Sequence, residues 1–389
     1  RALSPIVGRK HERALIEDCF NEAASGSGQV VLLCGEPGIG KSRLTMEAMA
    51  MSPRPADTLQ CAPHQENNAL YAFVEFMRSS RTNSLDAGKP WPDDFLSNRG
   101  IEDSNAAALA ELLLDGHTGG VTQITDPNVQ KQQTLTMARQ VLLANSSNTA
   151  SVLVIEDLHW IDPTTLELVN QLVHEIRTSR TLMLLTFRPT FTHDWMGQPH
   201  VHLLALNRMN RSQCEEMITG LLGGSISDAM KAEVVKKTDG IPLYIEEVVH
   251  TVADTAEGST HRRELVIPAT LAESLNARLD HTGDARRTAQ AASVIGRDFE
   301  IDLLCAVANR ERPIVLDDIQ TLVETGLILE FPGGKDNRYQ FKHALIQDAA
   351  YNGLVKARRT RFHKRAAEHL LESGTNRERL FGTIAHHLT

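Results

Sequence analysis

The sequence predicts an α/β fold for the first part of the chain, a parallel sheet with helices on both faces, followed by a helical lid and a winged-helix domain. Strand-like and helix-like segments alternate up to about residue 206, and helix-like segments dominate after it. A glycine-rich loop, GEPGIGKS at 35–42, follows the apolar run VVLL at 30–33, and a second apolar run, VLVI at 152–155, ends in two acids. Alternating strands and helices behind such a loop imply a parallel sheet.

The elements of the first region follow from helical spacing and from short apolar runs. Pro163 at a first helical position, with Asp162 before it as N-cap, marks the helix that follows the acids. Residues 82–128 are polar and rich in Gly, Asp and Asn, with one short helix expected at 105–116, and are interpreted as an insertion or mobile loop. The other expected helices are at 9–24, from the loop to about 51, at 69–80 and at 130–145, and the expected strands are at 30–33, near 57–63, at 152–155 and at 181–188.

Beyond residue 206 the pattern changes to helices, the first two at 210–223 and 227–240, and a third begins after the Gly-Ile-Pro turn at 240–242. A polar linker at 255–264 precedes further helices and a strand, turn and strand, a combination typical of a winged helix. The expected helices are at 271–280, 285–296 and 315–325, and the hairpin is at 327–343. The expected regions are a P-loop nucleotide-binding α/β domain at 1–206, a lid at 207–262, a winged-helix domain at 263–360 and the start of a helical repeat region at 361–389.

Composition narrows the class of protein. A net charge of −9 over 389 residues argues against a surface built for nucleic acid or anionic lipid. The five cysteines are widely spaced, without a C-x-x-C pattern, and indicate reduced thiols. No apolar run approaches the roughly 20 residues that span a bilayer, and no signal pattern opens the chain. We therefore expect a cytoplasmic protein, and because the chain begins with Arg1 and ends within a helix-like stretch, a piece of a longer one.

The loop at 35–42 has the Walker A pattern Gly-x-x-x-x-Gly-Lys-Ser after a strand. Its glycines allow backbone N–H groups to surround phosphates, Lys41 would reach the β and γ phosphates, and Ser42 would bind Mg²⁺ at a helix N-terminus. The alternative, a Gly/Pro turn with a capping serine, does not account for the preceding strand. The expected cofactors are ATP or ADP with Mg²⁺. The residues expected to bind nucleotide here are Gly35, Glu36, Pro37, Gly38, Ile39, Gly40, Lys41, Ser42 and Arg43.

The two acids after the second apolar run, Glu156 and Asp157, have the Walker B pattern. One acid would hold Mg²⁺ and the other would orient the attacking water, and the sequence does not decide which does which. The alternative is a pair of carboxylates that cap the next helix. Arg188 ends the next strand, where it would contact the γ-phosphate, or would be a solvated strand-end arginine. With Lys41, these are the expected catalytic residues, and Ser42, Glu156 and Asp157 are the expected metal ligands.

Several stretches in order resemble a known family, the signal-transduction ATPases with numerous domains, or STAND class, a branch of the AAA-related P-loop proteins. They are VGR at 7–9, GEPGIGKSRL, QCAPHQENNALY, VLVIEDLHWIDPTTLELV, LLTFRP, GIPLYIEEV and RYQFKHALIQDAAY. The likeness extends over nearly the whole chain. Within the family it is closest to modules joined to class III adenylate cyclase domains and TPR-type repeats.

The resemblance implies further nucleotide contacts. Val7, Gly8 and Arg9 would lie by the adenine or ribose, Pro242 would pack on adenine, and His343 would touch the β-phosphate, although its motif differs from the Met-His-Asp form and a core histidine explains it as well. The resemblance also implies partners: linked cyclase or TPR-type signalling domains and a nucleotide-dependent oligomer. The expected function is an ATP-binding, slowly hydrolysing signal-transduction switch.

Two other functions remain open. A winged helix is also found in DNA-binding transcriptional regulators, but the segment at 313–326 carries Asp317, Asp318 and Glu324 and no Lys or Arg, which makes it a poor reader of a major groove. The basic run at 356–372 has apolar residues at helical spacing and indicates a solvated amphipathic helix. We expect no direct nucleic acid binding and no membrane binding. The third function is a nucleotide-locked scaffold with little turnover.

Overall fold

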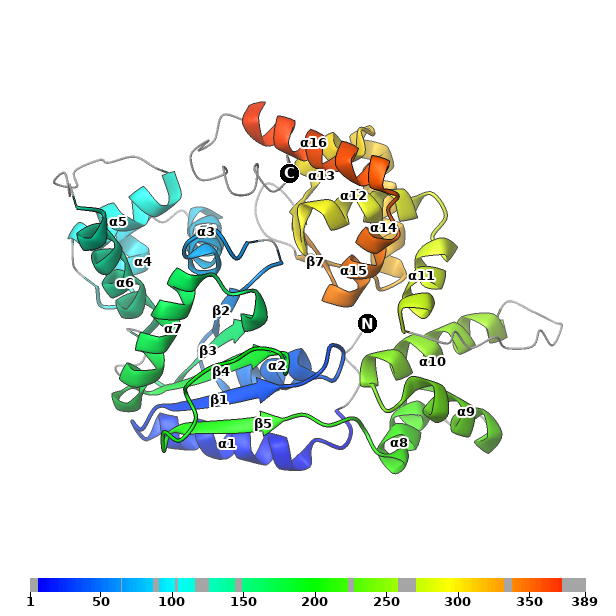
Figure 1. The fold of residues 1–389 in the computed structure, drawn as a ribbon, viewed down its shortest axis with the longest axis horizontal. Helices are drawn as coiled ribbons and strands as arrows, with labels where there is room; N and C mark the ends of the chain where they lie inside the picture. Colours follow the sequence, from blue (N-terminus) through cyan, green and yellow to red (C-terminus); the bar gives the residue numbers. More distant parts are fainter. Residues whose placement is uncertain are drawn as a thin grey trace.

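The structure is a computed structural model with three parts, an α/β domain, a small helical lid and a C-terminal unit of helices and a small sheet (Figure 1). It describes residues 6–63, 65–86, 91–101, 104–115, 126–143, 149–222, 227–257, 271–331 and 338–372. The expectations for most of the polar linker, for the hairpin turn at 332–337 and for the repeat region beyond 372 lie outside these residues.

The α/β domain is built on a sheet of five described strands, all parallel, in the order β2-β3-β4-β1-β5. Val30 and Leu32 of β1 face one hydrophobic core, and Val31 and Leu33 face the other. Both faces are buried, which is why the strands read as continuous apolar runs. The strands are β1 (Gln29–Cys34), β2 (Asp57–Gln60), β3 (Ser151–Glu156), β4 (Thr181–Phe187) and β5 (Val201–Ala205).

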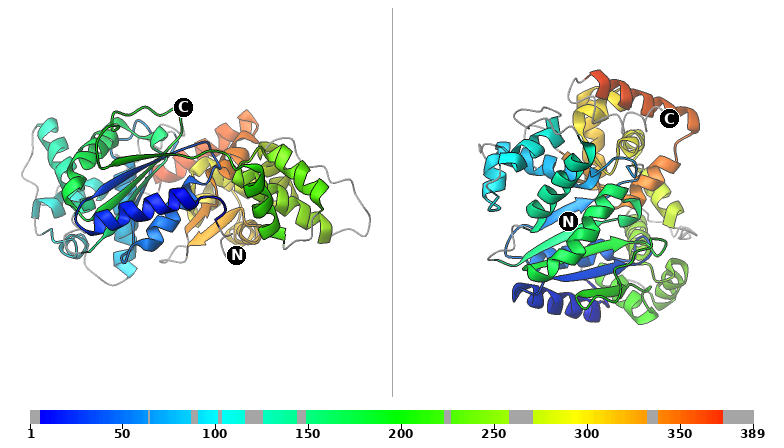
Figure 2. Two further views of the ribbon diagram at one scale, coloured as in Figure 1. Left: turned by 90° about the horizontal axis from the view of Figure 1, so that it is seen from below. Right: turned by 60° about the vertical axis from the view of Figure 1, so that its left-hand side comes forward.

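Helices cover the two faces of this sheet (Figure 2). Ile16 and Leu44 pack on one face, and Phe73 and Leu168 on the other. The Asp162 carboxylate accepts hydrogen bonds from two backbone N–H groups of the next helix, which confirms the expected cap. The first face carries α1 (Lys10–Ala24) and α2 (Lys41–Met51); the second carries α3 (Tyr71–Asp86), α6 (Pro127–Leu143) and α7 (Pro163–Glu175), with the short turns η2 (Leu158–Trp160) and η3 (Ile176–Thr178).

In the described part of 82–128 the interpretation as a mobile loop is wrong, the helix expected at 105–116 is confirmed, and the alternative of an insertion stays a prediction. Two helices, α4 (Asp93–Ser97) and α5 (Ser104–Asp115), bury apolar side chains such as Leu96 and Leu109 in the core of the domain. The Arg99 guanidinium binds both carboxylate oxygens of Asp57 on the edge strand β2, at 2.8 Å each. The polar composition was misleading because these short helices bury only one face.

Strand β5, which pairs with β1 and completes the sheet, was not predicted from the sequence. Val201 and Leu204 are buried whereas Leu203 and Ala205 are exposed, so that this edge strand is only partly covered. The strand is short and follows a loop. Its apolar residues come shortly before the helical region, and their pattern does not distinguish a strand from the start of that region.

The lid is a small helical domain with its own core, which includes Cys214, Val234 and Ile245. Its last helix begins at Pro242, as the sequence predicted. The lid helices are α8 (Arg211–Leu222), α9 (Asp228–Thr238) and α10 (Pro242–Glu257).

The C-terminal unit combines helices with an antiparallel sheet of three described strands in the order β6-β8-β7. Phe299 of β6 and Phe341 of β8 lie in one core, with ring centroids 5.7 Å apart. Its elements are α11 (Leu271–His281), α12 (Ala285–Ile295), β6 (Asp298–Glu300), α13 (Ile301–Ala308), α14 (Arg312–Glu324), β7 (Ile328–Phe331), β8 (Arg338–Phe341), α15 (Ala344–Asn352) and α16 (Lys356–Glu372).

Three of these elements were not predicted: β6 and α13 lie between the expected second and third helices, and α15 follows the hairpin. The boundary expected at 360 falls inside α16, which is continuous and buries Phe362 and Ala366 in the core of the C-terminal unit. The described part of the basic run therefore packs on this unit.

The acidic helix α14 carries its acids in two environments. Asp317 and Glu324 are exposed, whereas Asp318 is buried and forms an ion pair with Arg310. One of the three acids is therefore structural. No described helix is both long and apolar enough to cross a membrane.

Candidate nucleotide-binding site

The glycine-rich loop connects β1 to α2 at the edge of the sheet where the strands end. Gly38 and Gly40 have φ values of 76° and 104°, in the left-handed region that favours glycine. Gly40 is the N-cap of α2. Because it has no side chain, it cannot accept hydrogen bonds from the backbone N–H groups of the first helical turn. The first turn of α2 therefore presents backbone donors to the loop, which suits an anion.

Lys41 lies inside this loop. Its side chain is buried, and Nζ donates to the carbonyl oxygens of Gly35 at 2.7 Å and Glu36 at 3.0 Å. Burial lowers the pKa of Lys41, and the Asp157 carboxylate partly opposes that shift. A poorly solvated ammonium group at this position would interact strongly with a polyanion.

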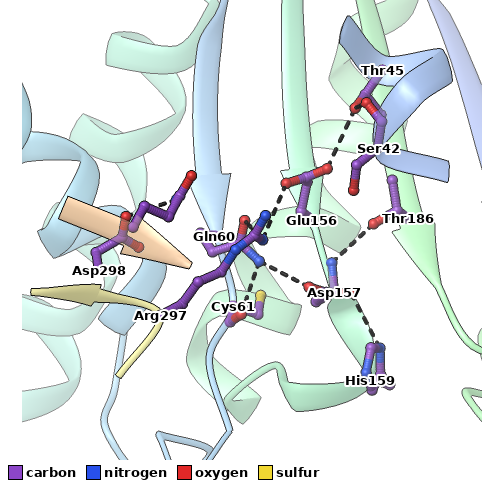
Figure 3. Close-up of polar contacts among 11 residues, drawn as sticks. Ser42, Thr45, Gln60, Cys61, Glu156, Asp157, His159, Thr186, Arg297 and Asp298 are labelled. Carbon is purple, nitrogen blue, oxygen red and sulfur yellow. Dashed lines mark hydrogen bonds and ion pairs between the residues drawn. The ribbon is translucent and has the colours of Figure 1, made fainter. Parts of the chain in front are cut away.

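The two acids lie beside the loop at the end of β3 (Figure 3). Glu156 is buried and accepts a 3.3 Å hydrogen bond from the Thr45 hydroxyl of α2. Asp157 adopts a left-handed backbone with φ of 59°, and its N–H donates to the Thr186 hydroxyl on β4. The Gln60 amide donates to the Asp157 carboxylate at 2.9 Å.

Both carboxyl groups are poorly hydrated. Burial raises the pKa of Glu156 and of Asp157, and the Arg297 guanidinium is the largest opposing influence on each. Arg297 belongs to the C-terminal unit, and its Nη1 lies 3.9 Å from Glu156 Oε2. The acids therefore depend on neighbouring cations to stay ionised.

The donor set fits a hard cation such as Mg²⁺. The Ser42 hydroxyl is close enough to Glu156 to help lower its pKa, so that a hydroxyl and a buried carboxylate lie together at the first turn of α2. Oxygen ligands of this kind are those that Mg²⁺ prefers, together with phosphate oxygens. Ser42 and Glu156 would hold the ion, and Asp157 lies next to them.

Comparison with known proteins agrees with this geometry. Residues 5–185 match the family described as AAA ATPase domain. This stretch, just under half of the chain, is therefore similar to an AAA-type ATPase module, and the α/β domain that contains it is called the AAA domain below.

Two relatives extend the comparison beyond the AAA domain. An uncharacterized protein of Rhizobium meliloti (strain 1021) is 27% identical over 381 residues, which cover 93% of this chain and 36% of the relative. A crystal structure of a STAND protein with a tetratricopeptide repeat sensor, from Pyrococcus horikoshii, is similar with a TM-score of 0.57 at 17% identity. That similarity covers 99% of this chain and 49% of the other. The chain thus spans about a third and about half of the lengths of these two proteins.

Arg188 lies at the same edge of the AAA domain as the acids. Its guanidinium carbon is 5.1 Å from the centre of the Trp160 ring, and its charge acts on Lys41 and Asp157. The structure therefore brings Arg188 to the loop and the acids. Its contact with a γ-phosphate stays a prediction.

His159 packs against its neighbour Trp160. Its ring lies 4.3 Å from the Trp160 ring, centroid to centroid, and Nδ1 is 4.0 Å from Asp157 Oδ1. Burial lowers the pKa of His159 to about 4, so that the ring is neutral near pH 7.

The stretch at 7–9 lies between the AAA domain and the lid. Arg9 is buried and donates to the carbonyl oxygens of Ile39 at 3.2 Å and Asn207 at 2.7 Å. Val7 packs against the lid core, and the Gly8 carbonyl oxygen accepts a hydrogen bond from Gln213. The Arg9 guanidinium therefore stabilises the loop by donating to the backbone carbonyl oxygen of Ile39.

The lid reaches the loop directly. Pro242 begins α10, and the next residue, Leu243, donates its backbone N–H to the Gly38 carbonyl oxygen. A Cβ on Gly38 would lie 3.0 Å from the Leu243 Cβ. Arg208, in the connection to the lid, donates to both carboxylate oxygens of Glu36 and also pairs with Asp239.

His343 lies in the C-terminal unit as the N-cap residue of α15. Its Nε2 is buried without a hydrogen-bond partner among the described residues. Burial lowers its pKa to about 3, helped by the cations Lys342, Arg297 and Arg278 of the same unit. The structure thus places His343 near Arg297, and its contact with a phosphate stays a prediction.

Four residues of this site were not predicted from the sequence. Thr45 and Gln60 donate hydrogen bonds to the two acids. Arg208 joins the loop to the lid, and Arg297 approaches Glu156 from the C-terminal unit. Thr45 follows the Walker A serine on the same helix and Gln60 lies within a predicted strand, so that both had a local signal. Arg297 had none, because only the tertiary fold brings it to the acids.

Proposed function

We propose that this chain is an ATP-binding and slowly hydrolysing switch module of the STAND class. The observation that carries the proposal is the hydrogen bond from Leu243 N–H to Gly38 O, which joins the lid to the phosphate-binding loop. A nucleotide on that loop would change the position of the lid only through contacts that differ between two arrangements. The direct contact between lid and loop supplies such a difference.

The chemistry follows from the residues at the sheet edge. Lys41 would bind the β and γ phosphates, and Ser42 with Glu156 would hold Mg²⁺, which neutralises phosphate charge when bound. Asp157 would orient the attacking water, or the two acids would exchange these roles. Arg188 would contact the γ-phosphate and respond to its loss.

Slow turnover rests on the resemblance to the STAND class and not on the acids, because burial raises the pKa of Glu156 and of Asp157 and a carboxylate with a raised pKa is the stronger base.

Three ion pairs support a switch between domain arrangements. Arg208 joins Glu36 of the loop to Asp239 of the lid, and Arg278 of α11 pairs with the buried Glu247 of α10. Ion pairs therefore join the loop to the lid, and the lid to the C-terminal unit. ADP would favour the closed arrangement, and the γ-phosphate of ATP would add contacts that compete with it.

The output of the switch would lie in linked domains. The resemblance supports a class III adenylate cyclase domain or TPR-type repeats, and a nucleotide-dependent oligomer, as partners. A role in a DNA-binding regulator is disfavoured by the exposed acids Asp317 and Glu324 on α14. We propose that α12 to β8 form a winged helix, a role supported by the order of helices and strands in that unit.

The proposal is tested by two measurements on the chain. Binding of a fluorescent ATP analogue, followed by single-turnover hydrolysis with Mg²⁺, should show tight binding and slow cleavage. Small-angle scattering with ADP and with a non-hydrolysable ATP analogue should give different profiles. Absence of binding would refute the nucleotide site, binding without cleavage would leave a nucleotide-locked scaffold, and identical profiles would remove the switch.

A further inference from the structure

Arg297 connects the C-terminal unit to the acids of the AAA domain. It lies between α12 and β6, and its side chain extends to the end of β3 (Figure 3). Its Nη1 is 3.9 Å from Glu156 Oε2 and donates to Gln60 Oε1 at 3.3 Å. The side chain is only 17% exposed, so that this ion pair is poorly screened by solvent.

The contact reaches both acids. Gln60 accepts from Arg297 through its carbonyl oxygen and donates to Asp157 Oδ2 through its amide, so that it relays the contact to the second acid. Arg297 Nε has no hydrogen-bond partner among the described residues. The guanidinium therefore makes few hydrogen bonds, and a competing cation can displace it from Glu156.

The backbone of Arg297 is fixed to its own unit. Its carbonyl oxygen accepts a hydrogen bond from Phe341 N–H, and the next residue, Asp298, pairs with Gln340 across the small sheet. The guanidinium can therefore move far from the acids only if the C-terminal unit shifts. Cation binding at Glu156 and the position of this unit are coupled.

We propose that Arg297 is an autoinhibitory contact that occupies the metal-binding face of Glu156, so that the C-terminal unit and a divalent cation compete for this carboxylate. The inference rests on the proposed function, because it assigns a regulator to the same Mg²⁺–nucleotide site. A divalent cation held by Ser42 and Glu156 would lie close to the guanidinium, and like charges at such a separation repel strongly in a buried site. By linkage, the cation weakens the docking of the unit by the same factor by which docking weakens the cation.

The test measures cation binding rather than turnover. A fluorescent ADP analogue is titrated onto the chain in EDTA and at rising Mg²⁺, for the wild type and Arg297→Gln. We expect affinity in EDTA to be the same within about twofold, and the half-saturating Mg²⁺ concentration to be roughly tenfold lower in the variant. Arg297→Lys, which keeps the charge on a shorter side chain without the planar fork, should lie between the two.

Arg338→Gln is the matched control. Arg338 lies in β8 of the same sheet and donates to Ser79 on α3 at 3.3 Å, so that it crosses the same interface without touching either acid. Its variant should leave the Mg²⁺ dependence unchanged. Equal shifts in the two variants would mean that a looser interface alone is responsible, and would overturn the inference.

Two further results separate the possibilities. Unchanged Mg²⁺ dependence in Arg297→Gln, with normal nucleotide binding, would overturn the inference and leave the proposed function intact. A large loss of affinity for the ADP analogue in EDTA would also overturn it, because Arg297 would then bind the phosphates. A wild-type chain that binds no nucleotide in either buffer would overturn the proposed function and the inference with it.

Discussion

Leu243 of the lid donates its backbone N–H to the carbonyl oxygen of Gly38 in the phosphate-binding loop, at 3.2 Å. The two residues also approach through their carbon atoms, since a Cβ on Gly38 would lie 3.0 Å from the Leu243 Cβ. The conformation of the loop and the position of the lid therefore depend on each other. Changes to the loop should alter how the lid packs.

Gly38→Ala should loosen the lid more than Gly40→Ala does. Both glycines have positive φ, so that either alanine adds strain of about 1–2 kcal/mol. Only Gly38 faces Leu243, whereas a Cβ on Gly40 meets nothing within 4 Å. Overpacking should therefore add about 1–3 kcal/mol in Gly38→Ala. Urea unfolding of the two variants measures the difference, and equal losses of stability would contradict the contact.

Lys41→Ala should weaken nucleotide binding without unfolding the chain. The loss of a charged donor to phosphate is worth about 1.5–3 kcal/mol, or roughly 10- to 150-fold in Kd. Stability should not fall much, because the buried ammonium group is itself poorly solvated. Calorimetric titration with ADP and a thermal melt check both points, with the exposed Lys10→Ala as control. Unchanged affinity in the folded variant would remove Lys41 from the site.

Glu156→Gln and Asp157→Asn should retain nucleotide binding and lose turnover. Removal of a general base or water-orienting carboxylate typically reduces the rate by about 10²- to 10⁴-fold. The variant with the larger loss in single-turnover hydrolysis identifies the water-orienting acid. The exposed Asp18→Asn serves as control. Wild-type rates in both variants would show that neither acid takes part.

His343 should make stability depend on pH in mildly acidic solution. Burial lowers its folded-state pKa from 6.5 to about 3, so that between these values the unfolded chain binds a proton that the folded chain does not. The free energy of unfolding should therefore fall as the pH falls from 6.5, by about 2 kcal/mol at pH 5. His343→Gln should lack this part of the loss, whereas the exposed His11→Gln should keep it. Parallel curves for all three proteins in urea unfolding would show that the His343 ring is protonated in the folded state.

The phosphate-binding loop and the two acids could be predicted because contiguous residues encode them. Gly35 to Ser42 specify backbone angles and a lysine within one turn, and the acids simply end a buried apolar strand. The helix at Pro163 was likewise marked by a local cap. In each of these cases the relevant energy comes from neighbours in the sequence.

Features that depend on distant neighbours could not be predicted in this way. Arg297 approaches Glu156 only because the C-terminal unit docks on the sheet edge, and nothing in the sequence around it differs from an ordinary arginine after a glycine. The helix at 93–97 lies in a polar range and has no helical pattern of its own, and its core contacts come from α3 and α5. Short strands such as β5 are stabilised by hydrogen bonds to a neighbouring strand, and the sequence alone does not show which strand that is.

The match to the AAA family ends at residue 185, but the sheet does not. Residue 185 lies within β4, and β5 at Val201–Ala205 covers the edge of β1 that does not pair with β4. A recombinant fragment cut at 185 would shorten β4 and leave the apolar edge of β1 open to pairing with other chains. Fragments that extend past residue 206 keep that edge covered, and expression trials of the isolated module should yield monodisperse protein only with the longer boundary.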